Sequence, residues 1–454
     1  MADASKYRAN KYVAIIGGGE SGVGAALLAK KMGYDVWVSD NAEIKSEYVM
    51  EMIMSQIAFE AEEHSESRII MADEVIVSPG IPLNVPILEK VREKNIPIIS
   101  EIEFASRYTD AHIIAITGSN GKTTTATLTY EMMKAGGLNV ALAGNIGVSF
   151  ARKILESKYE YFVLEISSFQ LDSMIDFKAD IAILLNITPD HLDRYNYEFD
   201  LYAASKMKIC MNQTSADAFI YNADDKVIES LMAKMDIESK LLPFSHEKEI
   251  SSEGAYIKDN KIYFQTNTDQ FIMDIEKLAL QGRANAYNTM AGGVAARLVE
   301  IRKESIKNCL SDFQGIPHRL EKVATVRGIN FINDSKATNV NSAWYALESM
   351  TKPVIWIMGG QDKGNDYSSL IPLVQDKVKA IICLGVDNSK IIDTFSPYIS
   401  NIIETMTADD AVLSSFYLGE PGDVVLLSPA CASFDLFESY EDRGDRFKRA
   451  VQDL

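Results

Sequence analysis

The sequence predicts an α/β protein of three domains, each built around a mostly parallel sheet. At 454 residues the chain is too long for one hydrophobic core, because domains usually contain about 100–200 residues. Short apolar runs alternate with helical segments along the chain, which is typical of βαβ units. Many of these runs end in polar residues, as strands do when a sheet binds a ligand at its carboxyl edge.

The composition is that of a globular protein and argues against polyanionic partners. Hydrophobic residues make up 47% of the chain and charged residues 24%, which are ordinary values. The net charge of −19 leaves no surplus of Lys and Arg for nucleic acid or an anionic membrane. The four cysteines have no CxxC spacing, which favours reduced thiols. Because no signal peptide or membrane-spanning stretch is evident, we expect a cytoplasmic protein.

Residues 1–108 are predicted to form the first domain. The apolar strand Tyr12–Ile16 leads into a G-x-G-x-x-G turn, and the strand Asp35–Ser39 then ends at Asp40. Such a turn binds a diphosphate, and the acidic residue about 20 positions later binds a ribose. NAD or another nucleotide diphosphate would suit the site, and a glycine turn that only packs a helix on a strand is the alternative. Further strands are predicted at Glu74–Val77 and Pro97–Ser100.

Residues 109–312 are predicted to form the central domain, around the run IIAITGSNGKTTT. An apolar strand enters the loop Gly118–Gly121, and Lys122 then opens a helix. Backbone N–H groups, the helix dipole and a lysine together bind phosphate. Only two residues separate the glycines, whereas the usual P-loop has four. We interpret the segment as an ATP site in which Thr123 binds magnesium; the alternative is a glycine turn with a chance lysine.

Five further polar residues of this domain are candidates. Glu165 lies near the end of an apolar strand, where a buried carboxylate needs Mg²⁺ or a salt-bridge partner. His191 follows another strand and is either a metal ligand or a solvated loop residue. Lys206 lies on a helical stretch and could be a surface residue. Asn285 and Asn288 share one helical face and could bind a base or ribose, or cap the helix. The predicted strands here are Val140–Ala143, Tyr161–Ile166 and Ile181–Ile187.

Residues 313–454 are predicted to form the third domain. Its predicted strands are Ile329–Ile332, Val354–Met358, Ala380–Leu384 and Asp423–Leu427. The loops NDSKATN, GGQDKG and SPACASFD follow three of them. Their lysines and hydroxyls are donors for carboxylate or phosphate oxygens, so an anionic ligand is indicated; plain turns are the alternative for any one loop.

Taken together, these motifs resemble one family. TGSNGKTT, LEISSFQL, DHLDRY, HRLE, NDSKATN, GGQDKG and SPACASFD occur over nearly the whole chain in the order and rough spacing of the Mur ligases of peptidoglycan synthesis. NDSKATN and SPACASFD indicate the branch that adds D-glutamate to UDP-N-acetylmuramoyl-L-alanine through an acyl phosphate. The alternatives are another Mur-type or folylpolyglutamate-type ligase with a different acceptor, or, in another class, a nucleotide-binding regulator or an NAD-dependent dehydrogenase.

The resemblance implies a Rossmann-like first domain, a P-loop-type central ATPase domain and a Rossmann-like third domain, and it implies the residues of each site. The implied catalytic residues are Lys122, His191, Lys206 and Arg319. The implied ATP-binding residues are Gly118, Ser119, Asn120, Gly121, Lys122, Thr123, Thr124, Asn285, Asn288, Arg319 and Asp334. The implied ligands of two Mg²⁺ ions are Thr123, Glu165, His191 and Lys206, the last carbamylated by CO₂.

The substrate sites follow in the same way. The residues implied for the UDP substrate, which takes the place of NAD, are Ser21, Asp40, Asn41, Ser78, Gly80, Asn145, Ser167 and Arg194. The residues implied for D-glutamate are Lys336, Thr338, Lys363, Ser433 and Tyr440. Gly24 and Ala284 stand where relatives often have Ser and His. The implied partners are small molecules, with no nucleic acid and no membrane, and we expect a monomer.

Overall fold

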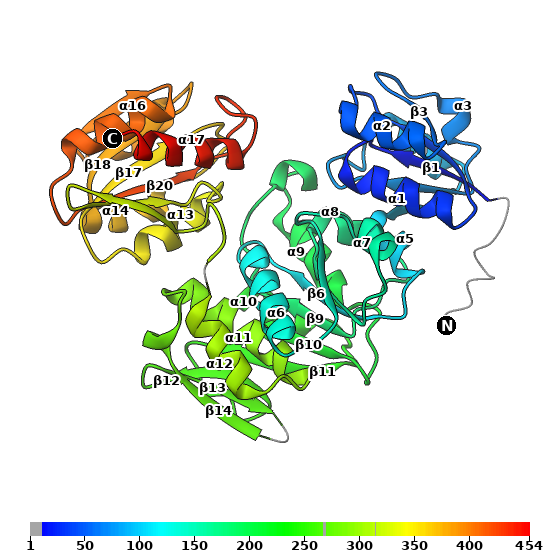
Figure 1. Cartoon of the computed structure of the whole chain (residues 1–454), viewed down its shortest axis with the longest axis horizontal. Helices are drawn as coiled ribbons and strands as arrows, with labels where there is room; N and C mark the ends of the chain where they lie inside the picture. Colours follow the sequence, from blue (N-terminus) through cyan, green and yellow to red (C-terminus); the bar gives the residue numbers. More distant parts are fainter. Residues whose placement is uncertain (1–10, 267–268, 314) are drawn as a thin grey trace. The chain divides into compact units, whose positions relative to one another are not determined.

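Three mostly parallel sheets organise the protein, whose computed structural model describes residues 11–266, 269–313 and 315–454 (Figure 1). Residues up to 277 together with 287–311 form one compact unit, and 278–286 with 312–454 form a second. The three-domain α/β architecture is confirmed, while the boundaries at 108 and 312 stay predictions. Within the described residues, no helix is both long and apolar enough to cross a membrane. The first ten residues, on which part of the signal-peptide prediction rests, lie outside the described residues.

The first sheet has the strand order β3-β2-β1-β4-β5, with every neighbouring pair parallel. Its elements are β1 (Tyr12–Ile16), α1 (Glu20–Lys31), β2 (Asp35–Ser39), α2 (Ser46–Met54), β3 (Ala58–Glu60), α3 (Glu66–Ile69), β4 (Glu74–Val77), α4 (Pro86–Glu93), β5 (Ile98–Ser100) and α5 (Glu101–Ser106). The chain leaves β1 toward β2 on one side and later returns to β4 on the other. The carboxyl end of β1 is therefore a topological switch point, where such sheets bind ligands.

The second sheet has the order β14-β13-β12-β11-β10-β9-β6-β8-β7, parallel except for the β12–β13–β14 meander. Its strands are β6 (His112–Thr117), β7 (Val140–Gly144), β8 (Tyr161–Glu165), β9 (Ile181–Leu184), β10 (Ala218–Asn222), β11 (Lys240–Ser245), β12 (Gly254–Lys258), β13 (Lys261–Thr266) and β14 (Asp269–Asp274). Its α-helices are α6 (Lys122–Ala135), α7 (Phe150–Glu156), α8 (Ser168–Asp172), α9 (Phe199–Met207), α10 (Lys226–Met232), α11 (Arg283–Leu298) and α12 (Lys303–Asp312). The strand predicted to reach Ile187 ends at Leu184.

The third sheet, in the second unit, has the order β15-β16-β20-β17-β18-β19, parallel except for the β15–β16 pair. Its strands are β15 (Glu321–Val326), β16 (Ile329–Asn333), β17 (Val354–Gly359), β18 (Val378–Leu384), β19 (Ile402–Thr405) and β20 (Val424–Ala430). Its α-helices are α13 (Val340–Glu348), α14 (Ile371–Lys377), α15 (Ser389–Phe395), α16 (Ala408–Leu418) and α17 (Tyr440–Gln452). Every residue of β17 and β20 is buried, as expected for strands covered by helices on both faces.

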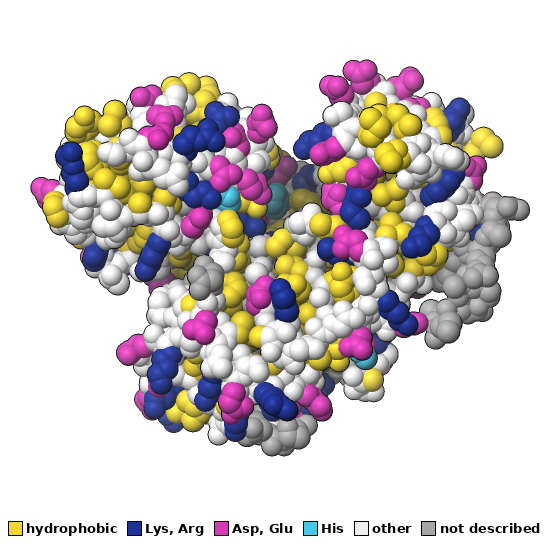
Figure 2. Space-filling view, in the orientation of Figure 1, with side chains coloured by type: hydrophobic (Ala, Val, Ile, Leu, Met, Phe, Trp, Pro, Cys, Tyr) yellow, Lys and Arg dark blue, Asp and Glu magenta, His cyan; other side chains and the backbone are white. Residues whose placement is uncertain are grey.

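Charged side chains stay mainly at the surface, where both signs are interspersed on the face drawn in Figure 2. Among the described residues drawn on that face, no large patch carries a single sign of charge. Because the net charge is −19, attraction of an anionic ligand depends on lysines and arginines placed locally at its site.

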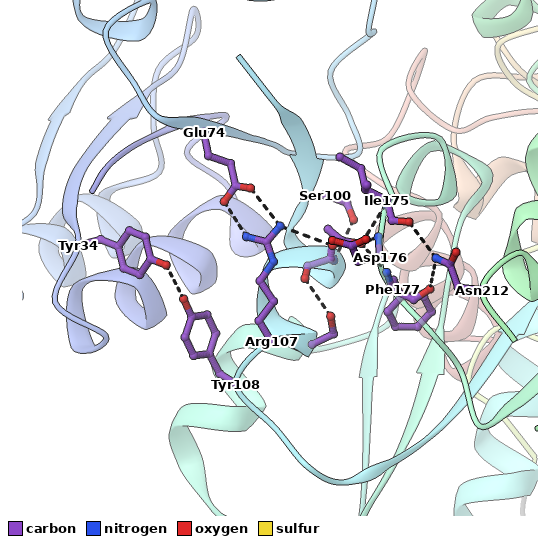
Figure 3. Close-up of polar contacts among 11 residues, drawn as sticks. Tyr34, Glu74, Ser100, Arg107, Tyr108, Ile175, Asp176, Phe177 and Asn212 are labelled. Atoms are coloured by element: carbon purple, nitrogen blue, oxygen red, sulfur yellow. Dashed lines mark hydrogen bonds and ion pairs between the residues drawn. The ribbon is translucent and has the colours of Figure 1, made fainter. Parts of the chain in front are cut away.

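A polar network joins α5 to the segment before β9 within the first unit (Figure 3). Glu103 is buried, and its Oε2 accepts the N–H groups of residues 175, 176 and 177 at 3.0, 3.1 and 2.8 Å. Arg107 forms a bidentate ion pair with Glu74, in which Nη1 donates to Oε2 at 2.8 Å and Nη2 donates to Oε1 at 3.0 Å. Because a buried carboxylate that accepts several N–H groups is well compensated, Glu103 stabilises the contact between α5 and residues 175–177.

Glu101 gives a prediction about stability and pH. It is buried, its Oε1 accepts the Ala151 N–H at 2.5 Å, and its Oε2 has no hydrogen-bond partner. Burial, and next the charge of Glu20, raise the pKa of Glu101 from 4.5 to about 8. Between these two values the folded protein holds a proton that the unfolded chain releases, so stability falls as the pH rises, by up to about 1.4 kcal/mol per pH unit.

We therefore expect Glu101→Gln to flatten this pH dependence, so that its stability relative to the wild type improves from pH 5 to pH 8. Urea denaturation at several pH values measures the effect. Glu89→Gln, which changes an exposed glutamate on α4, is the control and should leave the slope unchanged. An equal slope for the wild type and Glu101→Gln would contradict the prediction.

Candidate active site

The phosphate loop predicted from the sequence connects β6 to α6. Gly118 and Gly121 both have positive φ angles, 157° and 86°, which a glycine adopts without strain. A Cβ added at Gly121 would lie 2.3 Å from Asn288 Oδ1, so the close approach of α11 also requires a glycine. The four residues thus form a turn that leads into the start of a 14-residue helix, where the N–H groups of the first helical turn can bind phosphate. The N–H groups of Ser119 and Asn120 donate to Asn186 O and Asn186 Oδ1, both at 2.9 Å, so Asn186 holds the turn in this conformation.

Two lysines converge on one carbonyl oxygen of this loop. Lys122 Nζ donates to Gly118 O at 2.9 Å and to Ser119 O at 3.0 Å. Lys206 Nζ, which comes from α9, donates to the same Gly118 O at 2.8 Å. The structure therefore brings together two residues that are 84 positions apart in the sequence, and it places two amine groups beside the loop that would bind a phosphate.

Lys206 is a core residue rather than the surface lysine that was its alternative. It is 2% exposed, and its Nζ lies 4.7 Å from the centre of the Tyr202 ring. Burial, followed by the charge of Lys122, lowers the pKa of Lys206 well below its ordinary value. The neutral amine is therefore favoured at this position, and a neutral amine is a nucleophile whereas an ammonium is not.

Glu165 lies at the end of β8 and is 3% exposed. Its Oε1 accepts from Asn145 Nδ2 at 3.1 Å, whereas its Oε2 is buried and has no hydrogen-bond partner. A buried carboxylate oxygen without a partner is costly, and a cation would compensate it. The residues present therefore fit a hard cation such as Mg²⁺, although the described residues contain no cluster of three or more His, Cys, Asp or Glu side chains.

Other candidates of the central domain have varied settings. Thr123 is 4% exposed in the first turn of α6. His191 is half exposed and has a φ of 51°. Its ring packs edge-on against the ring of Phe169, with 5.3 Å between the two ring centres. Asn288 is buried and accepts from Thr125 Oγ1 at 3.3 Å, whereas Asn285 is partly exposed and donates to Gln281 O at 2.9 Å. Asn288 thus lies next to the phosphate loop, and its predicted role in binding ATP stays a prediction.

Side chains from two following loops form hydrogen bonds with the glycine turn of the first domain. Asp40 Oδ2 accepts the Gly18 N–H at 2.7 Å, and Ser78 Oγ donates to Gly17 O at 3.3 Å. Ser21 is partly buried, and Asn41 is exposed. Asp40, the residue predicted to bind a ribose, therefore stabilises the conformation of the glycine turn.

Arg194, Ser78 and Gly80 meet at the junction of the first two sheets. Arg194 donates to Gly80 O at 3.1 Å and to Ile81 O at 2.8 Å, and its guanidinium lies 4.2 Å from the centre of the Phe169 ring. A small pocket there is lined by Ser78, Phe169 and Arg194 among others. Ser167 lies near this region in sequence and caps α8 by accepting the Gln170 N–H at 3.3 Å. Of the predicted UDP-substrate residues, Ser78 and Arg194 line this pocket.

In the second unit, Asp334 and Arg319 lie close enough to interact. Asp334 is buried, its Oδ1 accepts the Leu320 N–H at 3.2 Å, and its Oδ2 accepts from Ser428 Oγ at 2.9 Å. Burial raises the pKa of Asp334 to about 6, against the opposing charge of Arg319. Arg319 Nε is buried without a hydrogen-bond partner. Arg319 Nε can therefore donate a hydrogen bond to a bound anion.

The predicted amino-acid residues follow β16, β17 and β20, which are neighbours in the third sheet. Lys336 Nζ lies 5.2 Å from the centre of the Tyr440 ring. Ser433 is buried, whereas Thr338 and Lys363 are exposed. The structure thus brings Lys336 and Tyr440 together and places the others on the adjoining loops.

Sequence reasoning missed Arg443, which is 1% exposed on α17. Its guanidinium donates to backbone oxygens of three loops, including Ser335 O at 2.9 Å. Its neighbour Gly444 has no room for a side chain, because a Cβ there would lie 2.2 Å from His318 Nδ1. A glycine within an otherwise charged helix is a sequence signal of such close packing.

Comparisons with known proteins agree with this architecture. Three domain family models match: the Mur ligase MurD-like N-terminal domain over residues 11–100, the Mur ligase middle domain over 116–296, and the Mur ligase glutamate ligase domain over 318–431. The solved structure of a pseudomurein peptide ligase type C from Methanothermus fervidus has a TM-score of 0.60 at 18% identity and covers 98% of this chain and 100% of its own. MurF ligase from Thermotoga maritima, solved in complex with ADP, has a TM-score of 0.61 at 15% identity, with 100% of each chain covered.

Curated relatives match over their full length. A protein of Christiangramia forsetii named UDP-N-acetylmuramoylalanine--D-glutamate ligase is 52% identical over 444 residues, which cover 98% of this chain and 100% of the relative. A protein of the same name from Bacteroides fragilis is 53% identical over 445 residues, with 98% of this chain and 100% of the relative covered. The chain therefore belongs to the Mur ligase family and, within it, to the MurD group.

Proposed function

We propose that this protein is an ATP-dependent ligase that adds D-glutamate to UDP-N-acetylmuramoyl-L-alanine in the cytoplasmic synthesis of peptidoglycan precursors. The observation that carries the proposal is the identity of about one half, over nearly the whole of both chains, with relatives named for this activity. Three features supply groups that this reaction needs: the phosphate loop, the Glu165 Oε2 that has no hydrogen-bond partner, and the loops of the third sheet that carry lysines.

The reaction is the activation of a carboxylate followed by its capture by an amine. One oxygen of the L-alanyl carboxylate attacks the γ-phosphorus of ATP, the bond to ADP breaks, and an acyl phosphate forms. The neutral amine of D-glutamate then attacks the acyl carbon, and phosphate leaves with the oxygen that it received. Phosphoryl transfer depends mainly on positioning and on neutralisation of charge, so the protein's task is to hold anions close together.

Residues of the phosphate loop and the third domain hold the nucleotide in this proposal. The loop N–H groups and Lys122 bind the β- and γ-phosphates, and Lys122 releases Gly118 O and Ser119 O to do so. Arg319 offsets the charge that develops during transfer, and Asp334 positions the nucleotide. The remaining proposed ATP-binding residues are Gly118, Ser119, Asn120, Gly121, Thr123, Thr124, Asn285 and Asn288.

Two Mg²⁺ ions are proposed, held by Thr123 and Glu165 at one site and by His191 and a carbamylated Lys206 at the other. Bound Mg²⁺ neutralises phosphate charge and orients the phosphoryl group. The buried Glu165 Oε2 without a partner supports the first site. Burial of Lys206 supports the carbamate, because a neutral amine adds to CO₂ and releases one proton, which converts a donor into a carboxylate-type ligand.

The two substrates are assigned to the first and third domains. The proposed UDP-substrate residues are Ser21, Asp40, Asn41, Ser78, Gly80, Asn145, Ser167 and Arg194. The proposed D-glutamate residues are Lys336, Thr338, Lys363, Ser433 and Tyr440. We propose residues 1–108, 109–312 and 313–454 as the UDP-substrate, ATP and amino-acid domains of a monomer that acts on small molecules, without nucleic-acid or membrane partners.

Release of phosphate from ATP tests the proposed function. With UDP-N-acetylmuramoyl-L-alanine present, we expect turnover when D-glutamate is added and at least about 100-fold less with L-glutamate or L-alanine, because donors fixed to one stereoisomer are left unpaired by the other. Turnover with L-alanine instead would indicate another Mur-type activity. No turnover with any acceptor would contradict the proposal.

Lys206→Ala tests the proposed carbamate. We expect kcat to fall by at least about 100-fold, because one ligand of a charge-neutralising metal is lost, and we expect high bicarbonate not to restore it. Lys208→Ala is the matched control, since Lys208 is a partly exposed lysine two residues later that pairs with Asp172 at 3.0 Å, and it should keep its activity. Full activity of Lys206→Ala would exclude the carbamate.

A further inference from the structure

Arg443 is a buried cation on α17, and the charge of Asp435 acts on it from nearby. It is 1% exposed, and no ion pair joins it to an acidic side chain within the part of the chain that the structure describes. Burial lowers the pKa of Arg443 to about 10, so the guanidinium remains charged at neutral pH. A buried charge is costly unless hydrogen bonds or a counter-charge compensate it. What surrounds this guanidinium therefore indicates what it does.

The guanidinium compensates its burial with oxygens from three loops. Nε donates to Ser335 Oγ at 3.0 Å and Nη2 to Ser335 O at 2.9 Å. Nη1 and Nη2 both donate to Cys431 O at 3.3 Å, and Nη1 also reaches Gly359 O at 3.5 Å. These oxygens belong to the ends of the adjacent strands β16, β20 and β17. One side chain of α17 thus ties together three strand ends.

The loops close tightly around the guanidinium. Gly360 has a φ of 127°, and a Cβ there would lie 2.2 Å from Ala432 O and 3.2 Å from Arg443 Nη1. Ser335 Oγ also donates to Tyr440 O at 2.8 Å, which attaches the start of α17 to the same point. The arrangement leaves little freedom for the loops to shift independently of Arg443.

We propose that Arg443 is a positioning residue of the D-glutamate site. Its hydrogen bonds hold the three loops that carry proposed D-glutamate residues in fixed positions relative to one another. The inference rests on the proposed function. Ser335 directly precedes Lys336, Cys431 lies two residues before Ser433, and Gly359 begins the loop that carries Lys363.

The nucleotide side of the third domain is anchored separately. Asp334 is held by Ser428, by the Leu320 N–H, and by its own N–H to Leu427 O at 2.7 Å. None of these contacts involves Arg443. Loss of the guanidinium should therefore affect the amino-acid substrate far more than ATP, which a general loss of folding would not do.

Steady-state kinetics of Arg443→Lys and Arg443→Met test this role. We expect KM for D-glutamate to rise by about tenfold or more in both, because small displacements of positioning groups cost that much, while KM for ATP and for the UDP substrate stays within about twofold. Arg446→Met is the matched control, because Arg446 is half exposed on the same helix and pairs with Asp442 at 2.8 Å. It should keep the wild-type KM values.

The outcomes separate this inference from the proposed function. Absence of wild-type turnover with D-glutamate would overturn both. A normal KM for D-glutamate in folded Arg443 variants, or an equal rise in all three KM values, would overturn the role of Arg443 alone. If those variants do not fold, Ser335→Ala decides: it removes only the Oγ contacts and should raise KM for D-glutamate by a smaller factor, whereas an unchanged KM overturns the inference.

Discussion

The carbonyl oxygen of Gly118 accepts hydrogen bonds from two lysines, and the central site depends on this arrangement. Lys122 comes from the first turn of α6 and Lys206 from α9. The two amines repel each other when both are charged. A phosphate would relieve that repulsion and could also accept hydrogen bonds from N–H groups in the first turn of α6. The protein is thus organised around an anion.

Each unit buries one basic side chain beside the loops that follow its strands, Lys206 in the first unit and Arg443 in the second. In the first unit, burial lowers the pKa of Lys206 well below its ordinary value, while in the second unit the guanidinium of Arg443 is held by loop oxygens. Each lies where parallel strands end, at the edge on which such sheets bind ligands. A chain with a net charge of −19 attracts anionic substrates by such local placement rather than by its overall field.

Much of the architecture could be predicted from the sequence, because buried parallel strands are continuous apolar runs. β1, β2 and β4 were predicted with their observed ends, and the phosphate loop was placed between the right strand and helix. β3 and β19 were missed since three- or four-residue edge strands carry little pattern. Arg443 was missed because a buried arginine has no periodic signature; only the three-dimensional packing of α17 on the loops reveals it.

The central claim is that ATP activates a substrate carboxylate as an acyl phosphate. UDP-N-acetylmuramoyl-L-alanine labelled with oxygen-18 in its alanyl carboxylate tests it most directly, by mass spectrometry of the phosphate released in the presence of ATP and D-glutamate. The account predicts one labelled oxygen in each phosphate, because the oxygen that attacks the γ-phosphorus leaves with it when the amine attacks. Unlabelled phosphate formed together with the amide product would contradict the account.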